Sequence, residues 1–255
     1  MSTAALTAVP PAGREARPGL GRLTLVELRK MTDTRAGFWL QLAIGALTVV
    51  IVTAIAIWGD TPDQDFRSLL GAAIQPASIL GPIVGVLLVA SEWSQRTAQI
   101  TFSLVPRRWR VLGAKVLAGI AWCAAAFVAS AAIAAAGTLA AGVEDAWRIP
   151  AALFFQDAFY LATSMLGGIA FGAALLASAP AIVLYFVLPI AWSIVGSLSA
   201  FEGAARWLDG SRTLSPLVEE TLSGTQWARA LTTLALWMVL PLLIGLWRIT
   251  REDVR

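Results

Sequence analysis

Residues Phe38–Trp58 read FWLQLAIGALTVVIVTAIAIW, a run without a single charged side chain. A helix needs about 20 consecutive apolar residues to cross the hydrocarbon core of a bilayer, and this run has that length. Phe38, Trp39 and Trp58 stand at its two ends, where aromatic rings anchor spanning helices at the membrane–water interface. The run therefore predicts a membrane-spanning helix.

Five further apolar runs meet the same requirement, at about residues 69–90, 111–141, 158–177, 181–200 and 230–247. The composition agrees, because 58% of the 255 residues are hydrophobic and only 14% are charged, against roughly 25% charged in soluble domains. We therefore expect an all-α polytopic membrane protein with six transmembrane helices in residues 20–255. Residues 1–19, rich in Ala, Pro and Gly, predict a disordered cytoplasmic tail. Ser178-Ala179-Pro180 predicts a tight link between the fourth and fifth spans.

The charged residues predict the orientation of these spans. Fourteen of the 19 basic residues fall in the N-terminal region, in residues 91–115 and in the C-terminal tail, whereas 10 of the 16 acidic residues fall in the alternate segments. Cytoplasmic segments of membrane proteins carry the excess of Lys and Arg. Both termini are therefore expected in the cytoplasm.

Several chemistries are excluded by residue type. The chain has no His and one Cys, Cys123, which excludes a His metal site, a Ser-His-Asp triad and an intrachain disulfide. Its two lysines, Lys30 and Lys115, are followed by Met31 and Val116, so no Walker A nucleotide loop is present. The basic residues flank apolar runs and form no stripe with interleaved aromatic residues, so we expect no nucleic-acid partner.

Two segments outside the spans predict short helices. Residues 20–36 mix Leu and Val with Arg, Lys and Glu27, which predicts an amphipathic helix at the membrane surface; an ordinary basic flank is the alternative. In residues 201–229, Ser215 as N-cap and Pro216 at the first helical position predict one or two short helices resting on the outer interface.

Small residues and one carboxylate inside the spans have two interpretations each. Gly81 and Gly85, with Gly168 and Gly172, allow close helix contacts, either in ordinary packing within the chain or in a seam that repacks or forms a dimer face. Asp157, at the outer start of the fourth span, is interpreted first as an interfacial residue. Its alternative is a functional carboxylate of an ion-driven carrier.

The first cytoplasmic loop is longer than a simple connection requires. An acid and an aromatic residue follow the second span, polar residues come next, and a Pro precedes a basic cluster; the residues concerned are Glu92, Trp93, Thr97, Thr101, Pro106, Arg107, Arg108 and Lys115. A solvated basic flank explains the arginines. Docking onto a cytoplasmic partner explains the whole pattern, with Glu92 capping the loop or pairing with the basic cluster.

This loop resembles the signature region of ABC-2 type transporter permeases, the membrane subunits of bacterial ABC exporters. Glu92-Trp93, Thr97, Thr101, Pro106-Arg107-Arg108 and Lys115 match that family's pattern, while Arg96 stands where a Gly commonly precedes the Thr. The segments Glu27–Met31 and Gly245–Val254 resemble the family's N-terminal elbow helix and its terminus.

The resemblance implies a permease subunit in the plasma membrane of a bacterium. Such a subunit forms the substrate path together with a second permease, identical or related. The pair binds two copies of a cytoplasmic ATPase, which carry the ATP and Mg. The elbow helix, with Glu27, Arg29 and Lys30, and the first loop would contact the ATPase, and membrane lipids would surround the spans. The alternatives are a non-transporting scaffold or immunity-type protein, an ion-driven carrier and, least favoured, an intramembrane enzyme.

Overall fold

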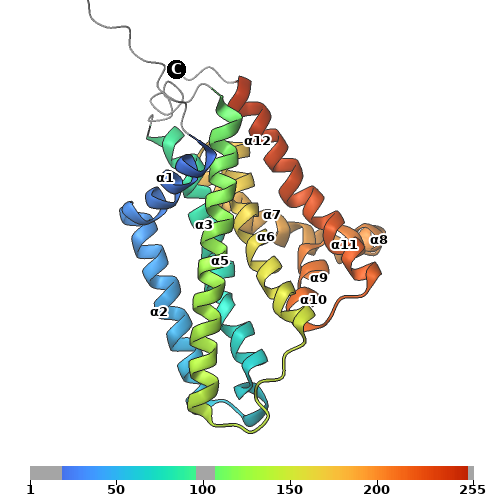
Figure 1. Cartoon of the computed structure of the whole chain (residues 1–255). Helices are drawn as coiled ribbons and strands as arrows, with labels where there is room; N and C mark the ends of the chain where they lie inside the picture. The colour runs from blue at the N-terminus through green and yellow to red at the C-terminus, as the bar shows by residue number, and fades with distance from the viewer. Residues whose placement is uncertain (1–18, 96–106, 252–255) are drawn as a thin grey trace, which may run out of the picture.

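The computed structural model describes residues 19–95 and 107–251, and every regular element within them is a helix (Figure 1). Six helical runs in this part of the chain are long and apolar enough to cross a membrane, which confirms the six predicted runs. They are α2 (Arg35–Trp58), α3 (Phe66–Ser94), α5 (Arg108–Ala141), α6 (Ala151–Leu175), α7 (Ser178–Gly196) and the continuous run Gly224–Arg251. The predicted tail, residues 1–19, lies outside the described residues apart from Gly19.

A separate helix, α1 (Leu20–Asp33), precedes the first of these runs. Thr34 alone separates α1 from α2; its backbone is extended, and its side chain accepts a hydrogen bond from the Gly37 N–H at 3.1 Å. This N-cap starts α2 three residues before the predicted apolar run and turns the chain sharply. Figure 1 shows α1 lying across the axis of α2, at the end of the bundle where α12 also ends. We call this the α1 end.

The link between α6 and α7 is shorter than predicted. Ser178, Ala179 and Pro180 form the first turn of α7, so the prediction that they form the link is wrong. The chain turns instead at Leu176, whose backbone is left-handed at φ 54°, and at Ala177, which is extended. Pro180 is tolerated because the N–H groups of a first helical turn have no partner within the helix.

Helix α3 lies at the centre of the bundle and packs most closely against α6. A Cβ on Gly168 would lie 2.1 Å from the Pro82 carbonyl oxygen, and one on Gly85 would lie 2.8 Å from that of Met165. Gly172 meets the backbone of Val86. These three glycines therefore lie where the backbones of α3 and α6 touch within the chain, whereas Gly81 faces the Trp122 ring of α5.

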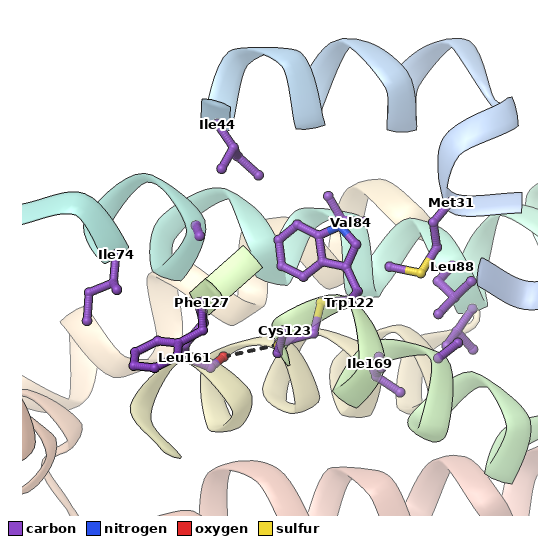
Figure 2. Packing of buried hydrophobic residues seen from close by; sticks show 14 of the residues in the cluster. Met31, Ile44, Ile74, Val84, Leu88, Trp122, Cys123, Phe127, Leu161 and Ile169 are labelled. Atoms are coloured by element: carbon purple, nitrogen blue, oxygen red, sulfur yellow. Dashed lines mark hydrogen bonds between the residues drawn. The ribbon is translucent and has the colours of Figure 1, made fainter. Parts of the chain in front are cut away.

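The apolar core joins six of the helices, α1, α2, α3, α5, α6 and α12. Trp122, Cys123 and Phe127 of α5 lie between side chains from α2, α3 and α6, and Met31 of α1 joins them at one end (Figure 2). The Cys123 thiol donates to the Leu161 carbonyl at 3.6 Å. α1 is thus attached to the bundle through apolar packing as well as through the polar contacts described below.

The region between α7 and the last run differs from the prediction. It holds the 3-10 turn η2 (Ser199–Phe201) and the short helices α8 (Glu202–Leu208), α9 (Gly210–Leu214) and α10 (Pro216–Glu219). Ser215 occupies the N-cap position of α10 and Pro216 opens the helix, as predicted. The Ser215 hydroxyl makes no capping hydrogen bond, because it donates to the Ser211 carbonyl.

These short helices fold back beside the long ones (Figure 1). Their position on the outer membrane interface stays a prediction. The last run consists of α11 (Gly224–Leu234), the π-helical segment η3 (Ala235–Val239) and α12 (Leu240–Arg251). Trp237, at the middle of that run, donates to the Leu208 carbonyl at 2.9 Å, and Thr233 donates to that of Trp207 at 2.8 Å. These two hydrogen bonds hold the end of α8 against the last run, because carbonyls at a helix end need partners outside the helix.

Candidate functional site

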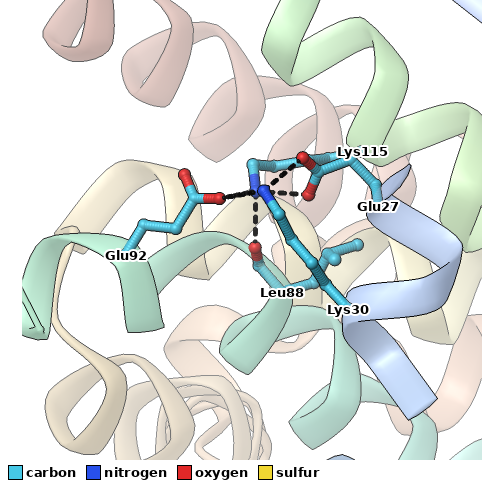
Figure 3. Close-up of polar contacts among 5 residues, drawn as sticks. All are labelled: Glu27, Lys30, Leu88, Glu92 and Lys115. Atoms are coloured by element: carbon cyan, nitrogen blue, oxygen red, sulfur yellow. Dashed lines mark hydrogen bonds and ion pairs between the residues drawn. The ribbon is translucent and has the colours of Figure 1, made fainter. Parts of the chain in front are cut away.

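Four charged side chains meet at the α1 end, and we call them the charge cluster: Glu27 and Lys30 of α1, Glu92 of α3 and Lys115 of α5. Glu27 and Lys30 are three residues apart and so share one face of α1. Glu92 lies in the last turn of α3, and Lys115 lies two turns into α5. Residues from three separate segments of the sequence are thus brought to one point (Figure 3).

Lys115 lies at the centre of the charge cluster. Its ammonium nitrogen donates to Glu27 Oε2 at 2.7 Å, to the Leu88 carbonyl at 2.8 Å and to Glu92 Oε1 at 3.0 Å. An ammonium group has three N–H donors, so each one has an acceptor. The residue is only 3% exposed, so these three acceptors replace the water that its ammonium group loses on burial.

Lys30 closes the charge cluster from its outer side. Its ammonium nitrogen lies 2.7 Å from Glu27 Oε1 and 2.7 Å from Glu92 Oε1. Partial burial lowers the pKa of Lys30, but the two carboxylates outweigh it and leave the pKa above its usual value of 10.5. Two carboxylates therefore face two ammonium groups, and the charge cluster is neutral as a whole.

A cavity of about 360 Å³ opens beside the charge cluster. Lys30 and Glu92 form its polar side; Val84, Leu87 and Leu88 form its apolar side. The Lys30 side chain is 39% exposed and that of Glu92 is 10% exposed, so Lys30 is the more accessible of the two at this cavity.

Two arginines near the α1 end, Arg108 of α5 and Arg248 of α12, bind carbonyls at helix ends. Arg108 donates to the Ile249 carbonyl at 2.9 Å, and Arg248 donates to the Ala174 carbonyl at 2.6 Å. These carbonyls belong to the last turns of α12 and α6, where cations are favoured by the helix dipole. Arg107 and Arg29 are exposed, and Trp93 packs on the core. Thr97, Thr101 and Pro106 lie outside the described residues.

Sequence reasoning named all four members of the charge cluster but did not place them together. It assigned Glu27 and Lys30 to one element and Glu92 and Lys115 to another. A signal was present in the sequence: the chain has only two lysines, and both fall in segments expected on the same side of the membrane. That pattern alone does not say which acids the lysines meet.

The interfacial interpretation of Asp157 is wrong. Asp157 is fully buried within α6 and lies 3.4 Å from the Arg67 guanidinium of α3. Arg67 also donates to the Val218 carbonyl of α10 through a close contact. Asp157 Oδ1 has no hydrogen-bond partner among the residues that the structure describes. Burial follows because α10 folds back over this end of α6.

Gln156, beside Asp157, is a further buried polar residue that sequence reasoning missed. Its amide donates to the carbonyls of Leu217 at 3.0 Å and Glu220 at 2.8 Å, and its carbonyl accepts from the Leu222 N–H at 3.2 Å. We call Arg67, Gln156 and Asp157 the α10 contact set. It holds the short helices against α3 and α6 at the opposite end of the bundle.

Within residues 19–95 and 107–251, no group of three or more His, Cys, Asp or Glu side chains could hold a metal ion. What the charge cluster can do is mechanical, since it joins three helices through ionic hydrogen bonds. No protein-family model matches the chain, and no curated protein matches it either.

Proposed function

We propose that the chain is a permease subunit of an ABC exporter, driven by ATP hydrolysis on a separate cytoplasmic subunit. The observation that carries the proposal is the charge cluster. Because it fixes α1 to the ends of α3 and α5, a force applied to α1 or to the loop between α3 and α5 moves these helices together. Such rigid attachment is what a membrane subunit needs if its energy source lies in another protein.

The sequence features support the same division of labour. The chain lacks a Walker A loop, and Glu92 and Lys115, which belong to the loop signature, are members of the charge cluster. In this proposal α1 is the elbow helix at the cytoplasmic surface, both termini are cytoplasmic, and two ATPase subunits bind at the α1 end. A second permease, identical or related, completes the substrate path in the plasma membrane, and ATP and Mg stay on the ATPase.

The test is purification of the tagged chain from its native membrane in mild detergent, followed by mass spectrometry of the stoichiometric partners. We expect a soluble subunit with a Walker A motif. A homo-oligomer without such a subunit, under conditions that preserve a known ABC exporter, would overturn the proposal and favour the scaffold or immunity-type function.

A second test asks whether the charge cluster couples the two subunits. Glu92→Gln keeps the shape of the side chain but removes the charge that Lys30 and Lys115 share. We expect less ATPase to co-purify, or its hydrolysis rate in the complex to change. Arg148→Met is the matched control, because Arg148 is 82% exposed and pairs only locally with Asp145. Equal behaviour of the two variants would contradict the coupling role.

A further inference from the structure

A cleft of about 410 Å³ lies between α3, α6, α7, α9 and the last helical run. The volume falls in the range of small-molecule sites in proteins. No residue of the charge cluster lines the cleft. The last run contributes Trp237 and Met238, which lie near the middle of that run.

Three irregular features of the backbone meet at this cleft. Pro189 lies inside α7 and, lacking an N–H, removes the usual donor to the Tyr185 carbonyl. Trp237 and Met238 belong to the π-helical segment η3, and α9 is one of the short helices that fold back. Backbone of this kind is tolerated at membrane depth where it is buried in protein or lines a cavity, and π-helical segments occur often at functional sites.

Three hydroxyls of the cleft already donate their protons within the chain. The hydroxyls of Thr163 and Ser164 donate to the Tyr160 carbonyl at 2.9 Å, and that of Tyr185 donates to the Ser164 carbonyl at 3.3 Å. A hydroxyl used in this way keeps its oxygen lone pairs as acceptors. The cleft therefore offers acceptors to a ligand that brings O–H or N–H donors.

None of the side chains that line the cleft is Asp, Glu, Lys or Arg. Asp209, adjacent in sequence to the lining residue Gly210, is fully buried and bound by Ser211 and Arg212. The remaining surface is largely aromatic, with Phe171 and Tyr185 in edge-to-face contact at 5.6 Å. A charged ligand would lose its hydration here without gaining a counter-charge.

We propose that this cleft binds an uncharged amphipathic molecule that has an apolar or aromatic body and at least one hydroxyl or amide donor. As the substrate class of the exporter, this assignment rests on the proposed function; as a binding site of the isolated chain, it does not. The donor group meets the hydroxyl oxygens of α6, and the apolar body lies against Phe171, Phe186 and Trp237.

The experiment is photolabelling of the purified full-length chain, without any ATPase, by three benzophenones of matched size. One has a hexyl chain ending in an alcohol, one ends in an amine and one ends in a carboxylate. Peptide mapping should place the alcohol probe on α6, α7 and the segment around Trp237. Labelling by the amine and the carboxylate should be weaker by roughly tenfold or more, because neither charge finds a partner in the cleft.

Matched substitutions on α7 test the position. Ile190 lines the cleft and is 61% exposed, whereas Val187 is 50% exposed and is not a lining residue. Ile190→Trp should lose most of the alcohol labelling, and Val187→Trp should keep it. If Ile190→Trp does not fold, excess 6-phenylhexanol is added to the wild-type chain instead. Loss of the alcohol labelling would then show that the probe occupies a saturable site.

Labelling outside the cleft, or equal labelling by all three probes, would overturn the assignment. Preferred labelling by the amine would overturn its uncharged character. The labelling experiment needs no partner subunit. Cleft labelling without a co-purifying ATPase would therefore overturn the exporter function and support the binding site. A co-purifying ATPase with no cleft labelling would do the reverse.

Discussion

Buried polar groups occur at both ends of this bundle, but the two sets are satisfied to different degrees. In the charge cluster, two carboxylates meet two ammonium groups at 2.7–3.0 Å, and each donor of Lys115 is used. In the α10 contact set, Arg67 and Asp157 stand 3.4 Å apart, and Asp157 Oδ1 has no described partner. A fully satisfied network is rigid, whereas a partly satisfied one loses fewer hydrogen bonds when it rearranges.

If the chain is the permease proposed above, the α1 end would be the driven end and the end with the α10 contact set would be the one that opens. The charge cluster would transmit displacement without deforming. The α10 contact set holds α10, the next helix after the cleft-lining α9, and its ion pair is longer than those of the charge cluster. The predictions below test whether the two regions really differ in this way, beginning with the largest expected effect.

Replacing Lys115 should have the largest effect. Lys115→Met leaves Glu27 and Glu92 buried with only Lys30 to oppose them, and breaking a buried ion pair from one side costs about 3–5 kcal/mol. The free energy of unfolding in mixed micelles, measured by SDS titration, should fall by that amount. The double variant Glu27→Met, Lys115→Met should fall by less than the sum of the single changes. Additive losses would show that the charge cluster is not one unit.

Replacing Gln156 should have an intermediate effect. Gln156→Leu leaves the carbonyls of Leu217 and Glu220 without their donor and the Leu222 N–H without its acceptor. Unsatisfied buried groups cost about 1–3 kcal/mol. The loss should appear first as faster proteolysis between α9 and α11, since α10 is held by these bonds. Unchanged proteolysis there would contradict the role given to the α10 contact set.

Asp157→Asn should change stability only slightly. The asparagine keeps one acceptor for Arg67, while its amide stands where a carboxylate oxygen already lacks a partner. We expect a change within about 1 kcal/mol in the same SDS titration. A loss as large as that of Lys115→Met would show that both ends are equally rigid and would remove the contrast.

The smallest expected effect is an alkaline loss of stability from Lys30. Its pKa is raised above 10.5 in the folded chain, so its stabilising contribution is complete below pH 10.5 and disappears as the pH rises through the folded-state value. Wild type should therefore lose more stability than Lys30→Met in thermal unfolding above that pH. Equal slopes for the two proteins would contradict the ion pairs of Lys30.

Prediction of the fold from sequence succeeded where composition alone decides. Each apolar run became a helix of spanning length, since a helix satisfies the backbone groups of a single segment without a partner segment. The ends were less predictable, since they depend on caps such as Thr34 and on the left-handed turn at Leu176. The α8–α10 segment was predicted to form one or two short helices, but its contacts with the long helices were not predicted. Its burial comes from bonds to Gln156, Arg67 and Trp237, which are distant in sequence.

The candidate site, like the fold, was predictable only in its local features. The sequence by itself determined that this chain is helical, that six of its helices are of spanning length, and that it has no nucleotide loop, because apolar run length and residue type are local properties. Only the tertiary structure decided that Glu27, Lys30, Glu92 and Lys115 form one neutral cluster and that a chargeless cleft lies between α6, α7 and η3. Such pairings depend on which helix faces meet, and that is settled by the packing of α3 against α5 and α6, where glycines let the backbones touch.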